Sequence, residues 1–176
     1  MINLKHLSKV EFNARRGSID NKGIQHFMEY YTDTMGDGST LEEVVVVCMK
    51  DTDMSDVPWI SWLFWLKRLK VLKLLADTIS DIYVSSMDES GKGCPALEDL
   101  TLGKDGSVLA NGLLKSLRRY PSLEYLTIGA RSLSEDDLIA LCTFRHLNYL
   151  QLQCTVPEDL LELLQDNISN VEIKSQ

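Results

Sequence analysis

The sequence has little positive charge, and this limits the partners it can bind. Its 176 residues contain 18 Lys and Arg against 26 Asp and Glu, which gives a formal net charge of −8. An acidic surface repels phosphate backbones, so we expect no nucleic-acid binding unless the chain carries a local basic stripe. The short basic groups at residues 67–70 and 118–119 are typical of solvated helix ends and do not form such a stripe.

The chain also lacks the apolar segments that secretion or membrane insertion would need. Residues 1–6 contain no apolar core of a signal peptide, and no stretch is long enough to span a bilayer. The four cysteines, at positions 48, 94, 142 and 154, are irregularly spaced and do not suggest a disulfide framework. We therefore expect reduced thiols and a cytoplasmic protein, with a nuclear location as the alternative.

No group of residues has the spacing of a metal, cofactor or catalytic site. Residues 51–62 begin like a calcium loop, but Asp56 stands where glycine is needed and Trp62 where a bidentate glutamate is needed. Cys142 and His146 are four residues apart, and no further ligands follow at metal spacing. We expect no metal, no cofactor and no enzymatic activity. An enzyme that uses Cys142 or Cys94 as a nucleophile is the weaker alternative.

One pattern occurs three times in the second half of the chain. The motif L-x-x-L-x-L, with isoleucine allowed at the last position, occupies residues 97–102, 123–128 and 147–152. In an extended strand the first, fourth and sixth of these positions face the core, while the third and fifth face outward. A lone strand-and-helix unit cannot bury its own apolar face, so neighbouring units must stack.

Related segments extend the array in both directions. We expect further strands at residues 4–12, 41–48, 69–74 and 171–173, and helices at 23–31, 108–117, from about 135 and after Pro157. The four valines at 44–47 fit either a strand buried on both faces or an apolar outer face. These segments predict a single α/β domain over residues 1–176, with a parallel sheet of about six or seven strands.

Two segments resemble leucine-rich repeats of known families. The phrase C-P-x-L-x-x-L-x-L at residues 94–102 resembles the cysteine-containing repeats of F-box proteins. Residues 112–123 resemble the ribonuclease-inhibitor-like repeats that NOD-like receptors share, and residues 20–24 are similar to the start of their helices. The resemblance implies a leucine-rich repeat horseshoe, a solenoid with a concave parallel sheet and helices on the convex side. It also implies a non-catalytic adaptor that binds a partner protein, as in ubiquitin ligases and innate immunity.

The chain departs from those families at one turn position. The residue three places after the last strand leucine is usually Asn or Cys, whereas here Asp77, Asp105, Arg131 and Thr155 occupy it. A hydrogen-bonded ladder of asparagines is therefore not expected.

The outward strand positions are the candidate partner-binding residues on the concave face. They are Val45, Val71, Lys73, Thr101, Tyr125, Thr127, Tyr149 and Gln151. We expect Tyr125 beside Tyr149 and Val45 beside Val71 on adjacent strands, with Val47 and Leu75 extending the apolar patch. Exposed tyrosines are favoured interface anchors, and cross-strand packing without any ligand is the alternative.

A second candidate surface is the apolar segment that contains Trp59, Trp62 and Trp65. Three tryptophans at this spacing share one helix face, so Trp59 and Trp62 could contact a partner. Packing against the sheet is the alternative. An assembly subunit, covered by a second copy or by a larger complex at its end strand and at this segment, is the second functional hypothesis. The sequence does not identify the partner.

Overall fold

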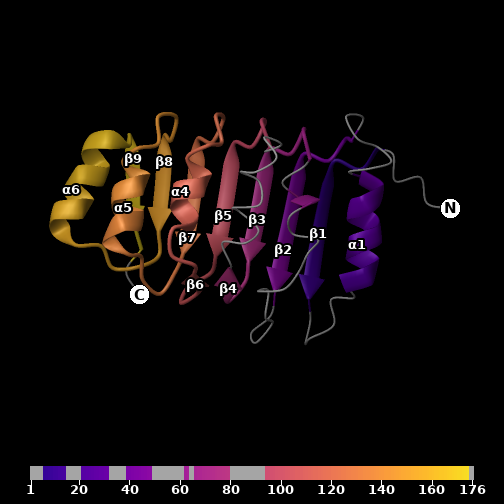
Figure 1. Ribbon diagram of the computed structural model, residues 1–176, viewed down its shortest axis with the longest axis horizontal. Coiled ribbons are helices and arrows are strands. Elements are labelled where there is room, and N and C mark those ends of the chain that lie inside the picture. The colour runs from indigo at the N-terminus through magenta and orange to yellow at the C-terminus, as the bar shows by residue number, and fades with distance from the viewer. Residues whose placement is uncertain are drawn as a thin grey trace.

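The computed structural model describes residues 6–14, 21–31, 39–48, 62–63, 66–79 and 94–174, and these residues form one large sheet with helices over one face (Figure 1). In chain order the elements are β1 (Lys9–Ala14), α1 (Asn21–Glu29), β2 (Glu43–Cys48), β3 (Val71–Leu75), β4 (Thr78–Ile79), β5 (Asp99–Gly103), β6 (Val108–Leu109), α4 (Leu113–Leu117), β7 (Tyr125–Gly129), α5 (Glu135–Leu141), β8 (Tyr149–Leu152), α6 (Glu158–Asn167) and β9 (Asn170–Ile173).

The large sheet has seven strands in the order β1-β2-β3-β5-β7-β8-β9, and every neighbouring pair is parallel. The colour in Figure 1 therefore passes from indigo to yellow steadily along the sheet. Each strand pairs with the strand of the next unit, so units stack in sequence order and each buries the apolar face of its neighbour. The predicted α/β class and parallel sheet are confirmed.

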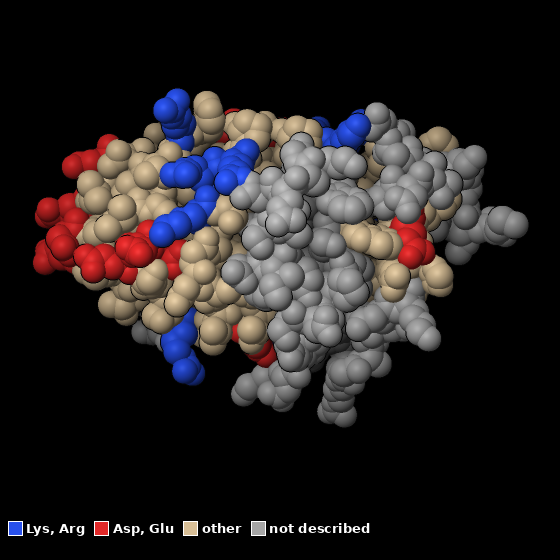
Figure 2. Space-filling model, in the orientation of Figure 1, with Lys and Arg blue, Asp and Glu red and all other residues tan. Residues whose placement is uncertain are grey.

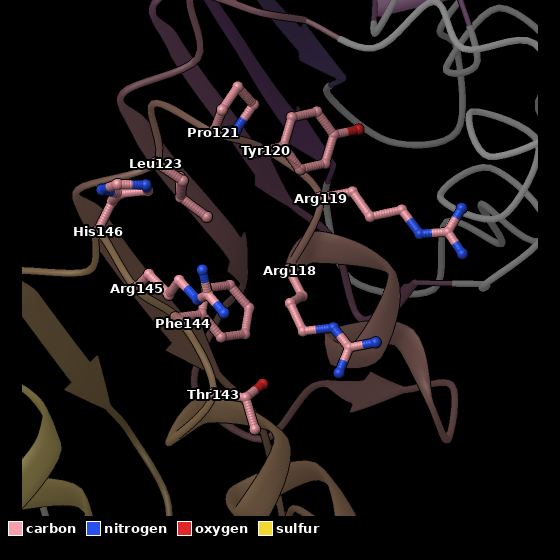
Figure 3. Close-up of a pocket in the computed structure, with 9 residues that line it drawn as sticks. All are labelled: Arg118, Arg119, Tyr120, Pro121, Leu123, Thr143, Phe144, Arg145 and His146. Carbon is pink, nitrogen blue, oxygen red and sulfur yellow. The ribbon is translucent and has the colours of Figure 1, made fainter.

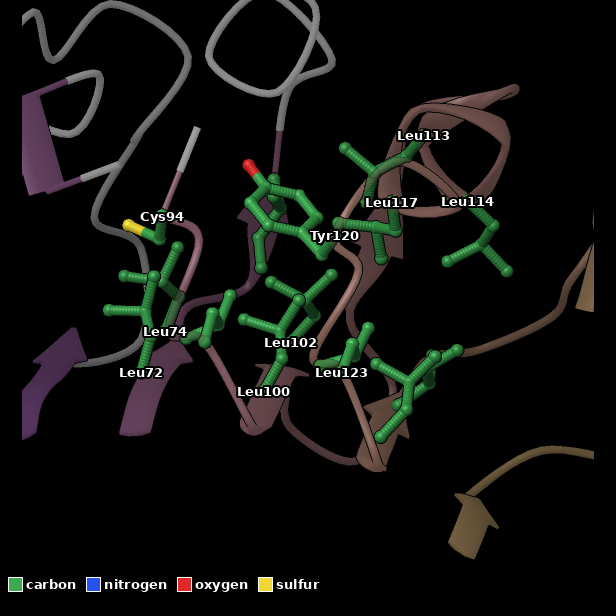
Figure 4. Packing of buried hydrophobic residues seen from close by; sticks show 14 of the residues in the cluster. Leu72, Leu74, Cys94, Leu100, Leu102, Leu113, Leu114, Leu117, Tyr120 and Leu123 are labelled. Atoms are coloured by element: carbon green, nitrogen blue, oxygen red, sulfur yellow. The ribbon is translucent and has the colours of Figure 1, made fainter. Parts of the chain in front are cut away.

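The core consists of two apolar rows that run across the sheet on its helix-covered side. The fourth motif positions align as Val44, Leu72, Leu100, Leu126 and Leu150, and the sixth positions as Val46, Leu74, Leu102, Ile128 and Leu152. All ten side chains are buried. Figure 4 shows the central part of these rows facing the leucines of α4. Full burial of one such side chain stabilises the fold by about 1.5–3 kcal/mol. The predicted inward positions of the motif are confirmed.

The helix predicted over residues 108–117 begins later than expected. Val108 and Leu109 form β6, which pairs in parallel with β4, and α4 starts only at Leu113. Gly112 explains the difference, because its φ of 81° is a left-handed conformation that an α-helix cannot continue through. The apolar spacing alone did not reveal this break. Strand β1 also runs to Ala14, two residues past its predicted end.

The start of α5 matches the predicted acidic first turn and adds a contact between units. Ser134 caps the helix by accepting a hydrogen bond from the Asp137 backbone N–H at 3.1 Å, and its hydroxyl donates to Asp137 Oδ2 at 2.6 Å. Asp137 is buried, and its Oδ1 accepts from the Gly112 N–H at 3.2 Å. One carboxylate therefore fixes the start of α5 and joins it to the turn before α4.

A serine and a lysine join successive units at the carboxyl ends of the strands. Ser107 is buried; its hydroxyl donates to the Ala76 carbonyl at 2.7 Å and accepts from the Lys104 N–H at 2.8 Å. Lys104 Nζ lies 2.9 Å from Asp77 Oδ1 and donates to the Cys48 carbonyl at 3.2 Å. The sequence predicts no ladder of asparagines at this edge of the sheet. These contacts join consecutive units there instead.

Candidate functional site

The candidate site is the open face of the sheet, which we define as the face opposite α1, α4, α5 and α6. Its side chains form two rows. The first row is Lys9, Glu43, Val71, Asp99, Tyr125, Tyr149 and Asn170, and the second row is Glu11, Val45, Lys73, Thr101, Thr127, Gln151 and Glu172. All fourteen residues are exposed or half-buried. The eight strand residues predicted for the site therefore share this face.

The tyrosine pair lies where the sequence placed it. Tyr125 and Tyr149 are register partners on β7 and β8, and their ring centroids are 6.3 Å apart with planes tilted by 40°. Tyr149 Oη donates its one proton to Glu172 Oε2 at 2.8 Å, and Gln151 Oε1 lies within hydrogen-bonding distance of the same hydroxyl at 3.2 Å. Tyr125 is 48% exposed, and its hydroxyl has no hydrogen bond to any described residue. Tyr149 is thus held by residues of its own sheet, whereas the ring of Tyr125 is partly exposed and its hydroxyl makes no hydrogen bond to a described residue.

The hydrogen bond to Glu172 also affects ionisation at this end of the face. This hydrogen bond is the main cause that raises the pKa of Tyr149 above its usual value. A phenolate would have no proton to donate to Glu172 and would be repelled by the carboxylate. Tyr149 is therefore a neutral hydrogen-bond donor at physiological pH. This end of the open face therefore presents a hydrogen-bonded phenol beside a carboxylate.

The open face is charged between β1 and β5. Lys9 Nζ and Glu43 Oε1 form an ion pair at 2.7 Å between β1 and β2. Burial raises the pKa of Asp99, with the Lys73 ammonium opposing the shift and the Glu43 carboxylate adding to it. A half-buried carboxylate between charges of both signs can accept hydrogen bonds from a partner that brings its own donors.

The apolar part of the face differs from the prediction in one respect. Val47 and Leu75 are register partners, as expected, but Val45 pairs with Lys73 and Val71 pairs with Glu43. Val45 occupies the fifth position of its motif and Val71 the third position of the next. A parallel register pairs equal motif positions, so the two valines are diagonal neighbours on β2 and β3 and not direct partners. The four side chains still lie on the same two strands, each half-buried. Of the two readings of the valine run, an apolar outer face is the correct one, since Val44 and Val46 face the core.

Only part of the tryptophan segment can be placed. Trp59 and Trp65 lie outside the described residues, so their predicted role stays a prediction. Trp62 is half-buried and packs against the hydrophobic core, and the neighbouring Leu63 is completely buried. The position of Trp62 favours the core-packing alternative for this residue.

The thiols have the environment of structural cysteines. Burial raises the pKa of Cys48 to about 11 and also raises the pKa of Cys94, Cys142 and Cys154. A thiol with a raised pKa carries little nucleophilic thiolate at neutral pH. Cys142 Sγ contacts the Leu138 carbonyl at 3.6 Å and sits at the end of α5. Within the described ranges, no three His, Cys, Asp or Glu side chains are grouped to hold a metal ion.

Sequence reasoning missed the polar contacts that organise the open face. Lys9 and Glu43 occupy the same motif position in consecutive units, and Gln151 and Glu172 do so at the other end. Because a parallel register places equal positions side by side, comparing charges at equal positions would have found the ion pair.

Comparisons with other proteins add no family assignment. Neither a scan of the sequence against protein-family models nor a search of curated proteins gives a match. Across the part of the chain that the structure describes, no helix combines the length and apolar character that crossing a membrane requires.

Proposed function

We propose that the chain is a leucine-rich repeat module of horseshoe shape that binds a partner protein on the open face of its sheet, in the cytoplasm. The arrangement of the outward residues supports this proposal most. Each of the seven strands adds one residue to the first row and one residue to the second row. A partner can thus contact residues from many units without any change in the core.

Tyr125 is the expected anchor of this interface. It combines a large ring, an exposed face and an unsatisfied hydroxyl, and an aromatic residue of this kind brings contact area at low entropic cost. Tyr149 lies beside it and is held by Glu172, so Tyr149 is already oriented and loses little freedom when a partner binds. Thr127 and Gln151 lie next to the pair on the same two strands, and the rows continue through Thr101, Lys73, Val71 and Val45 towards β2.

The test compares the unmodified chain with Tyr125→Ala, Tyr149→Ala and the double variant. Proteins captured from cell extract are identified by mass spectrometry, and each candidate is then purified and titrated directly. We expect Tyr125→Ala to weaken binding by about 2 kcal/mol or more, roughly thirty-fold, as for a central aromatic anchor. Because Tyr125 is nearly half exposed, its loss should change thermal stability little.

A matched control is available on the helix side of the molecule. Ile139 in α5 and Leu163 in α6 are 44% and 39% exposed, close to the exposure of Tyr125. An Ile139→Ala, Leu163→Ala variant therefore removes similar apolar surface from the other face. Equal affinity of the double tyrosine variant and the unmodified chain would refute the open-face proposal.

An assembly subunit is the second candidate, and the edge strand β9 favours it. Val171 and Ile173 are register partners of Leu150 and Leu152, yet they are only half-buried where the interior positions are completely buried. Another chain that covers β9 would complete this burial, as in a ubiquitin-ligase adaptor or an innate immune sensor. Sedimentation velocity tests self-association: a species that stays monomeric at high concentration would contradict it, and a concentration-dependent dimer that Val171→Asp dissociates would support it.

A further inference from the structure

Charge is unevenly distributed over the helix side of the molecule. The acidic residues gather on the last two helices, with Glu135 and Asp136 in the first turn of α5 and Glu158 and Asp159 in the first turn of α6. Figure 2 shows this red area at one end and a separate blue area nearer the middle. A protein with net charge −8 that gathers cations in one place creates a local site for anions.

A pocket lies within this basic region, at the amino-terminal edge of the sheet. It has a volume of about 480 Å³ and opens between the connection from α4 to β7 and the connection from α5 to β8 (Figure 3). The described residues that line it are Arg118, Arg119, Tyr120, Pro121, Leu123, Thr143, Phe144, Arg145 and His146. Among the described residues no carboxylate lines the pocket, and the pocket is separate from the open face.

Of the described arginines that line the pocket, Arg118 and Arg145 are available for a ligand. Arg118 and Arg145 are exposed, come from the two different connections, and form no ion pair with any described residue. The hydroxyl of Thr143 already donates to the Ala140 carbonyl at 2.6 Å, so the guanidinium groups are the main donors. Guanidinium forks match the paired oxygens of carboxylates and phosphates and hold them by two parallel hydrogen bonds.

The floor of the pocket is apolar. Tyr120, Leu123 and Phe144 are 6%, 1% and 8% exposed, and they occupy the space between the two arginine-bearing connections. Burial raises the pKa of Tyr120, so this phenol stays neutral and does not repel an anion. A ligand that fits both parts must carry an anionic group at its tip and an apolar body behind it.

We propose that this pocket binds the phosphorylated side chain of a partner peptide, with phosphotyrosine as the best fit. Its phosphate brings a charge near −2 and three acceptor oxygens, enough for guanidinium groups from both connections. Its ring can pack on the small parts of Tyr120 and Phe144 that reach the pocket, which the shorter side chains of phosphoserine and glutamate would not reach. A long polyanion such as nucleic acid would extend from the pocket over the acidic surface of α5 and α6, which disfavours it.

The test uses small probes on the purified chain, measured by isothermal titration calorimetry. The probes are N-acetyl-phosphotyrosine amide, N-acetyl-tyrosine amide, N-acetyl-phosphoserine amide and inorganic phosphate. We expect saturable binding of the phosphotyrosine probe, at least about tenfold tighter than binding of the other three. Its affinity should fall as salt is added, because exposed guanidinium groups are screened.

Four variants assign the binding to this pocket. Arg118→Gln and Arg145→Gln each remove one guanidinium group, and each should weaken binding of the phosphotyrosine probe by about tenfold. Arg145→Lys keeps the positive charge but loses the forked guanidinium group, so its affinity for the probe should lie between those of the unmodified chain and Arg145→Gln. Arg131→Gln is the matched control, because Arg131 is exposed and follows the carboxyl end of β7 at the opposite edge of the sheet. Thermal melting checks that all four variants fold equally well.

Several results would overturn the proposal. These are an absence of saturable binding, equal affinity of the Arg118→Gln, Arg145→Gln and Arg131→Gln variants, or a phosphoserine or phosphate probe that binds as tightly as phosphotyrosine. Anionic lipid vesicles and a single-stranded oligonucleotide form two further arms. If either binds through Arg118 and Arg145 while the phosphotyrosine probe does not, the ligand is not a phosphopeptide.

Discussion

Replacing Ser107 by alanine tests whether the carboxyl edge of the sheet holds consecutive units together. The hydroxyl of Ser107 is buried and makes two short hydrogen bonds, to the Ala76 carbonyl in the preceding unit and from the Lys104 N–H in its own. Alanine keeps the backbone conformation and removes only the oxygen. The change therefore isolates the polar contact from the packing around it.

The expected cost follows from the number and burial of the groups involved. Two neutral hydrogen bonds contribute about 0.5–1.5 kcal/mol each, and a buried carbonyl that loses its donor adds part of its desolvation cost. We expect Ser107→Ala to lower the free energy of unfolding by about 2–3 kcal/mol. The Lys104–Asp77 ion pair is about one third exposed at both side chains and should not replace this contribution.

Urea denaturation monitored by circular dichroism measures this loss, and Ser122→Ala supplies the control. Ser122 Oγ donates to the Pro95 carbonyl at 2.8 Å, also across two units, but the bond is exposed to solvent. Its removal should cost about 0.5 kcal/mol or less, since water takes over the lost partner. The reasoning fails if both variants lose the same stability, or if Ser107→Ala lies within about 0.5 kcal/mol of the unmodified chain.

Two further predictions concern the same framework. Gly103→Ala should destabilise the fold by several kcal/mol more than Gly106→Ala in a melting experiment, because both glycines have positive φ but only the Cβ at 103 would collide with the Gly129 carbonyl oxygen; equal losses would contradict the collision. The thiols should react slowly with a disulfide reagent at pH 7 and faster as the pH rises, since their pKa values are raised, with the partly exposed Cys142 first and Cys94 last; a fast-reacting Cys94 would show that the thiol is not buried as described.

Much of the fold could be predicted because its determinants are local and periodic. Each strand carries its own inward positions, so the motif alone assigned Leu100, Leu126 and Leu150 to the core. The start of a helix is less visible in such a pattern. The break before α4 depends on the left-handed Gly112, and apolar spacing contains no information about the sign of φ.

The edge pocket could not be found from local sequence because it depends on stacking. Arg118 and Arg119 alone resemble solvated helix ends, and Arg145 lies in the next unit. A signal exists at the level of the repeat, because Tyr120 and Phe144 each stand three residues before the first leucine of their motifs, Leu123 and Leu147. Aligning the units therefore places the two aromatic residues side by side and brings the neighbouring arginines together.

The two sides of each strand differ in how much they contribute to stability, so outward residues can be substituted at lower cost than inward ones. The inward rows are buried and supply the apolar contacts, so substitutions there cost several kcal/mol. The outward rows contribute cross-strand pairs, such as the half-exposed Lys9–Glu43 pair. Each such pair stabilises the fold by only a fraction of the free energy that an inward residue contributes. A residue such as Tyr125 is therefore not required by stability, since nearly half of its surface faces solvent where a smaller polar side chain would serve equally well. Its position on the open face, beside a second tyrosine that is already held by Glu172, supports the interface proposed above.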